Sequence, residues 1–192
     1  MLSRLFDRLS AERNPSGYRP GVTLEHLRRN LGVAGWHLLD AQRARLTLGE
    51  LVFEVRERTE SQLFMHLVMS EFVLQVQGRS RCTGRYAVHH GGAIRRTGLH
   101  CRARGGDGQA LADLQAALLH DAPLREALMP LDFKHLRLEV IDGLWCLRLE
   151  HMGGSEVVNR LPAFRRYIAL GAEQKACLFA ALQAWRRILG EI

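Results

Sequence analysis

The chain has 192 residues, of which 47% are hydrophobic and 24% charged, which is typical of one globular domain and excludes a wholly disordered or fibrous protein. The formal net charge of +7 favours an anionic partner. No stretch approaches the 18 uninterrupted apolar residues of a transmembrane helix, and four widely spaced cysteines in a chain of this size indicate reduced thiols. We therefore expect a cytoplasmic protein without a membrane-spanning segment.

The first 22 residues are predicted to be an arm. An apolar stripe with the spacing of a short amphipathic helix over 2–12 consists of Leu2, Leu5, Phe6 and Leu9. Two prolines and two glycines over 14–21 then predict a linker, and no small-residue cleavage site of a signal peptide follows the stripe. We expect the helix to dock on its own domain, predicted to span 23–192, with a homodimer as the second choice and a lipid surface as the third.

The next segments predict a helix followed by antiparallel strands. Thr23 is expected as the N-cap of a short helix with Leu24, Leu27 and Leu31 on one face. From Trp36 apolar and polar residues alternate, as in half-buried strands. Thr59-Glu60 is predicted as a hairpin tip, and residues 62–77 fit either a strand or a helix.

The second half of the chain carries clear helix and turn signals. Asp107 and Asp121 are predicted to cap two successive helices, the second with a proline in its first turn. Asp142-Gly143 predicts a tight hairpin. A terminal helix is expected from Gly171 to Gly190. The predicted fold is therefore α+β, an antiparallel sheet packed by helices, with an N-terminal helical arm and a C-terminal helix.

Positive charge is concentrated between Phe72 and Gly106, a stretch that contains no Asp or Glu. Its seven arginines are Arg79, Arg81, Arg85, Arg95, Arg96, Arg102 and Arg104. We interpret this segment as the surface that meets an acidic partner. The alternative is that the chain simply prefers Arg to Lys and that basic strand edges prevent aggregation.

A second group of basic residues surrounds Pro162. Arg165 and Arg166 would point to opposite faces of a strand, so only one could join Arg160 in a site. We add Arg160 and Arg166 to the predicted anion-binding and partner-binding residues, with a solvated edge strand as the alternative.

Templates for catalysis and metal binding are not matched. Cys82, His89, His90, His100 and Cys101 lack the spacing of zinc ligands. Cys82 and Cys101 are the candidate cysteine nucleophiles, because neighbouring arginines would favour the thiolate, but no orienting group for a histidine partner is apparent. The motifs Gly153-Gly-Ser155 and Gly105-Gly-Asp-Gly108 are neither a nucleophile elbow nor a phosphate-binding loop. No catalytic residue, metal or cofactor is predicted.

Three short stretches carry a resemblance to a known family. They are Gly105-Gly-Asp, Met129-Pro-Leu-Asp-Phe and Ser155-Glu-Val-Val-Asn-Arg-Leu-Pro-Ala-Phe-Arg-Arg-Tyr. In these residues the chain resembles an uncharacterised bacterial family of unknown function. The resemblance implies a bacterial soluble protein and supplies no activity or ligand.

The predicted function is a non-enzymatic binding module that presents the segment 79–104 to an acidic partner. A protein partner is preferred to nucleic acid, because Tyr86 is the only aromatic residue between Phe72 and Gly106 that could stack on a base. Nucleic-acid binding is the first alternative. The second is a small enzyme in which a histidine from 89–100 acts as general base while Arg160 or Arg166 holds an anionic substrate.

Overall fold

A computed structural model describes residue 15 and residues 17–61, 64–92 and 95–192. The described strands form a nine-stranded antiparallel sheet in the order β1-β2-β3-β4-β8-β7-β5-β6, with β9 paired to β8. The strands are β1 (Gly35–Asp40), β2 (Arg43–Leu48), β3 (Leu51–Ser61), β4 (Met65–Gln77), β5 (Gly84–Gly91), β6 (Gly98–Gly106), β7 (Phe133–Ile141), β8 (Leu144–Arg160) and β9 (Ala163–Ile168). The predicted helix over 2–12 lies outside the described residues.

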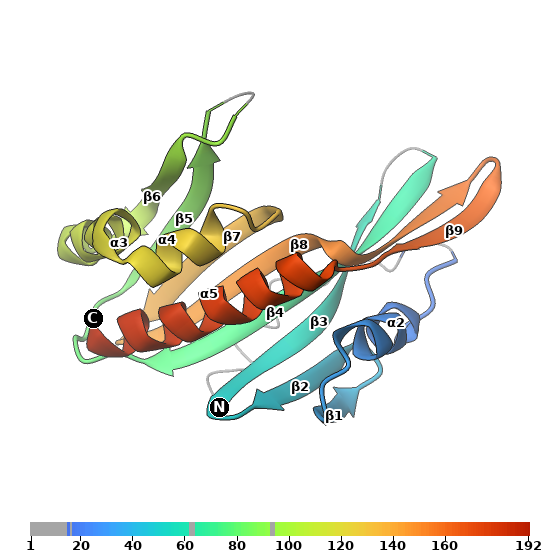
Figure 1. Cartoon of the computed structure of the whole chain (residues 1–192), viewed down its shortest axis with the longest axis horizontal. Coiled ribbons are helices and arrows are strands. Elements are labelled where there is room, and N and C mark those ends of the chain that lie inside the picture. The colour runs from blue at the N-terminus through green and yellow to red at the C-terminus, as the bar shows by residue number, and fades with distance from the viewer. Residues whose placement is uncertain (1–14, 16, 62–63, 93–94) are drawn as a thin grey trace.

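The described helices cover one face of this sheet (Figure 1). They are α2 (Val22–Leu31), α3 (Gly108–His120), α4 (Ala122–Leu128) and α5 (Ala172–Glu191). Their apolar faces and the inward side chains of the strands form a single cluster of buried residues. The predicted α+β class is confirmed, and no described helix is long and apolar enough to cross a membrane.

The ambiguous segment 62–77 contains a strand. β4 pairs with β3 on one side and with β8 on the other, and all residues from His66 to Leu74 are buried. A strand buried on both faces has a continuous apolar run instead of an alternating one, which is why the sequence also fitted a helix. The predicted tip at Thr59-Glu60 is wrong, because β3 continues to Ser61 and Glu60 pairs with Leu67.

The N-cap predicted for α2 is also wrong. The helix begins at Val22 with Gly21 at the N-cap, and the hydroxyl group of Thr23 donates instead to Glu156 at 3.3 Å. The first N–H groups of α2 are satisfied by the carboxylate of Glu57 on β3, which accepts from Gly21 and Leu24, each at 2.9 Å. A carboxylate from elsewhere in the chain thus replaces the local cap.

The caps predicted for α3 and α4 and the hairpin turn between β7 and β8 are confirmed, whereas α5 continues one residue past the predicted end at Gly190. Asp107 accepts from the N–H of Ala110, and Asp121 accepts from the N–H of Leu124, each at 2.9 Å. Asp142 and Gly143 both have positive φ, at 49° and 80°, between β7 and β8, as the two-residue hairpin requires.

Candidate anion-binding site

Successive side chains of a strand point to opposite faces of the sheet, and charged side chains are aligned on the face opposite the helices. On β7 the residues Leu136, Leu138 and Val140 are buried in the core, so His135, Arg137 and Glu139 point to the other face. The strand pairing places four residues of this face in one row across the sheet. Arg148 on β8 lies opposite Arg137, and Arg137 lies opposite Ala87 on β5. Ala87 in turn lies opposite Arg102 on β6. Arginines from three strands therefore flank one small side chain.

This face is hollowed into a cavity of about 730 Å³, which we call the basic groove. Its cationic lining residues are Arg58, Arg85, Arg102, Arg104, Lys134, Arg137 and Arg148. Glu139 is the carboxylate among the described lining residues, and His89 and His135 also line the groove. The lining has a net positive charge and suits an anionic group.

Two buried glutamates hold the floor of the groove in place. The side chains of Glu71 and Glu150 are each 5% exposed. Glu150 lies 2.9 Å from Arg58 and 3.8 Å from Arg137, and Glu71 lies 3.3 Å from Arg148. These ion pairs fix the guanidinium groups of three strands that would otherwise repel one another.

The cations of β6 are not neutralised in this way. Arg85 on β5 lies 3.5 Å from Glu139 and is largely exposed. Arg102 and Arg104 are exposed and form no ion pair within the described part of the chain. The two arginines of β6 are therefore the groove cations with the most charge available to a ligand.

Burial lowers the pKa of both groove histidines. The nearby Arg102 adds to the effect on His89, and burial outweighs the opposing attraction of Glu150 on His135. Burial therefore favours the neutral form of both rings. His90 points away from the groove, with its Nε2 2.9 Å from the carbonyl oxygen of Leu128 and its ring stacked on Phe133.

The nine predicted binding arginines do not form one site. Arg85, Arg102 and Arg104 line the groove, whereas Arg79 and Arg81 lie in the connection between β4 and β5 and Arg95 is exposed near the end of the β5–β6 hairpin. Arg160 ends β8 and Arg166 lies on β9, in a hairpin at the opposite end of the sheet from β5 and β6 (Figure 1). A site combining Arg166 with a histidine of 89–100 is therefore not formed.

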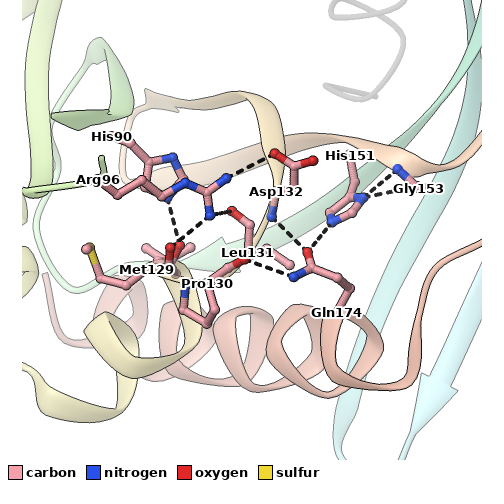
Figure 2. A network of polar contacts seen from close by, with 10 residues as sticks. His90, Arg96, Met129, Pro130, Leu131, Asp132, His151, Gly153 and Gln174 are labelled. Carbon is pink, nitrogen blue, oxygen red and sulfur yellow. Dashed lines mark hydrogen bonds and ion pairs between the residues drawn. The ribbon is translucent and has the colours of Figure 1, made fainter. Parts of the chain in front are cut away.

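Arg96 has a structural role instead of a place in the groove. Its guanidinium group donates to the carbonyl oxygens of Met129 and Leu131 at 2.9 and 3.2 Å and lies 3.0 Å from the carboxylate of Asp132 (Figure 2). The connection between α4 and β7 is thereby tied to the β5–β6 hairpin.

Sequence reasoning missed four groove cations, Arg58, Lys134, Arg137 and Arg148. They lie in stretches of balanced charge, so net charge along the chain does not single them out. The signal for two of them was present, because the Asp142-Gly143 hairpin fixes the pairing of Arg137 with Arg148.

The cysteines are poor nucleophiles in this structure. Burial raises the pKa of the Cys101 thiol to about 11 and also raises the pKa of Cys82 and of Cys146, which lines the groove. The arginines near Cys82 and Cys101 do not overcome this desolvation, contrary to the effect considered from the sequence. In the described ranges, no three His, Cys, Asp or Glu side chains converge as metal ligands.

Comparison with known proteins gives one family match. A family model described as "Protein of unknown function (DUF3156)" matches residues 29–189, which include every described strand and every residue of the groove. Neither the curated proteins nor the solved structures contain a match to the chain. The expected resemblance to an uncharacterised family is confirmed, and the chain belongs to the DUF3156 family.

Proposed function

We propose that this protein is a binding module whose basic groove receives an acidic segment of a partner protein. The observation that carries the proposal is the charge of the lining around a hollow of about 730 Å³, in which Arg102 and Arg104 face no described carboxylate while the other cations are ion-paired. Carboxylates entering the hollow would form charge-assisted hydrogen bonds with Arg102 and Arg104, beside the arginines that Glu71 and Glu150 hold in position.

The lining favours a protein over a nucleic acid. Tyr86 is the aromatic residue among the described lining residues, and it is only 1% exposed. Its hydroxyl group donates to the carbonyl oxygen of Asp107 at 2.8 Å, and its ring packs on Trp145. It therefore offers no surface on which a base could stack, which single-strand binders need.

The experiment is a titration of a fluorescent polyglutamate peptide with the intact chain at low and moderate salt. The double variant Arg102→Glu/Arg104→Glu should weaken binding about tenfold or more, because two charge-assisted contacts become repulsive. The matched control is Arg79→Glu/Arg95→Glu, which makes the same charge change at two exposed arginines outside the groove. It should weaken binding less than about threefold, through long-range electrostatics alone.

Equal loss in the two double variants would show that net charge, and not the groove, attracts the peptide, and would overturn the proposal. Tighter binding of a single-stranded oligonucleotide than of the peptide, with the same dependence on Arg102 and Arg104, would assign the groove to nucleic acid instead.

A further inference from the structure

A second surface lies at the far end of the molecule from the groove's β5–β6 rim. Three large apolar side chains, Phe64, Leu161 and Phe164, are 62%, 79% and 47% exposed at the ends of two hairpins. We call these three residues the tip patch. Met65 pairs with Asn159, and Asn159 pairs with Phe164, so the ends of the β3–β4 and β8–β9 hairpins lie side by side although their segments are about one hundred residues apart.

The two hairpins extend past the helical layer (Figure 1). No helix of the described chain covers their ends, so the tip patch belongs to a projecting surface and not to a hollow. Removing one large apolar side chain from water is favourable by a free energy of about 1.5–3 kcal/mol. A monomer in water gains nothing from exposing three of them together.

The two segments that carry the tip patch contain no carboxylate, and Glu60 near the end of β3 is paired with Lys134. The sequence contains no Asp or Glu from 61 to 70 or from 157 to 172. Arg166 is exposed, lies two residues from Phe164 on the same side of β9, and forms no ion pair with any described residue. Arg165, on the other side, is occupied by the carbonyl oxygen of Gly17 at 2.5 Å and by Glu156 at 3.6 Å.

We propose that the tip patch inserts into the interfacial region of an anionic lipid bilayer, with Arg166 at the level of the lipid head groups. A bilayer accepts a projecting apolar tip without needing a complementary cavity, and its negative surface attracts Arg166, which no described carboxylate opposes. A second copy of the chain fits less well, because two patches flanked by the same positive charge would repel each other. This inference does not depend on the basic groove.

The test is cosedimentation of the full chain with vesicles of phosphatidylcholine, with and without an equal part of phosphatidylserine. The intact chain should bind the mixed vesicles. Its binding to pure phosphatidylcholine should be weaker by at least about tenfold. The double variant Phe64→Ser/Phe164→Ser should lose about tenfold in binding to the mixed vesicles. Arg166→Gln should weaken binding severalfold on the mixed vesicles only.

The matched control is Leu38→Ser/Leu119→Ser, which replaces two leucines that are 58% and 62% exposed elsewhere on the surface. It should bind as the intact chain does. The groove variant Arg102→Glu/Arg104→Glu separates the two proposals, since it should lose the acidic peptide and keep the lipid.

Three results would overturn the inference. They are no binding of the intact chain to the mixed vesicles, retained binding in the tip variant, and lipid binding that disappears in the groove variant alone. A tip variant that no longer self-associates while vesicle binding is unchanged would assign the patch to a second copy. Circular dichroism checks that each variant is folded, and the single variant Phe164→Ser replaces the double one if it is not.

Discussion

Gln174 connects three parts of the fold, and its removal should destabilise the protein. The side chain lies in the first turn of α5, where its Oε1 accepts from the N–H of Asp132 and from Nε2 of His151, both at 2.8 Å (Figure 2). Its Nε2 donates to the carbonyl oxygen of Pro130 at 2.9 Å. Helix α5, the connection between α4 and β7, and the middle of β8 therefore meet at one amide.

The magnitude follows from the contacts that Gln174→Ala would break. Three neutral hydrogen bonds contribute about 1 kcal/mol each to stability. His151 is also buried, and because Gly153 donates its N–H to Nδ1 at 2.8 Å, the ring proton sits on Nε2. That N–H would lose its acceptor inside the protein. We expect the free energy of unfolding to fall by about 3 kcal/mol, or the melting temperature by about 6–12 °C.

The assay is urea denaturation followed by circular dichroism, with Gln183→Ala as the matched control. Gln183 is on the same helix, is exposed and forms no hydrogen bond among the described residues. The control carries the same change in helix propensity and should leave stability within about 0.5 kcal/mol of the original. If both variants unfold at the same urea concentration, the three hydrogen bonds of the Gln174 amide do not stabilise the fold.

Three further predictions concern pH, capping and packing. Burial lowers the pKa of His151. Below about pH 6.5 the unfolded chain therefore takes up a proton more readily than the folded chain, and stability falls as the solution is acidified. Gln174→Glu places a carboxylate beside the ring and should reduce this loss of stability between pH 7 and pH 5, as measured by urea titrations. Glu57→Ala removes the acceptor for the first N–H groups of α2 and should cost about 2 kcal/mol, with faster amide exchange confined to that helix. Leu147→Ala in the fully buried centre of β8 should cost about 2–5 kcal/mol, whereas Leu119→Ala at a surface position should change the midpoint little.

Each of these predictions has a contradicting result. An unchanged pH dependence in Gln174→Glu would mean that His151 does not titrate as described. Exchange rates in α2 that are the same with and without Glu57 would remove its role as the cap. A loss below about 1 kcal/mol for Leu147→Ala would show that the centre of the sheet is loosely packed.

The elements that the sequence predicted well are those fixed by neighbouring residues. Asp107, Asp121 and the Asp142-Gly143 turn act on N–H groups or backbone angles within three residues of themselves, so their signals are local. The start of α2 could not be predicted in this way, because its cap comes from Glu57 on another strand.

The candidate site was predictable only in part, for the same reason. Charge counting identified Arg102 and Arg104, which lie in a stretch without carboxylates. Arg58 joins them through the pairing of β3 with β4 and of β4 with β8, contacts between residues far apart in the sequence. No pattern within one segment reports which distant strands become neighbours.

The path of the chain through β4 and β8 has a consequence for how the groove is assembled. Gln77 at the end of β4 pairs with Leu144 at the start of β8, and the N–H of Gly78 donates to the carbonyl oxygen of Gly143 at 2.9 Å. The segment 78–143 therefore starts and ends at the same place beside the sheet. This segment, 78–143, carries five of the groove's cations, whereas Arg58 lies on β3, the neighbour of β4, and Arg148 lies on β8. The proposed groove is therefore complete only when the segment 78–143 has closed onto β8, and a ligand bound there would by mass action stabilise the closed arrangement.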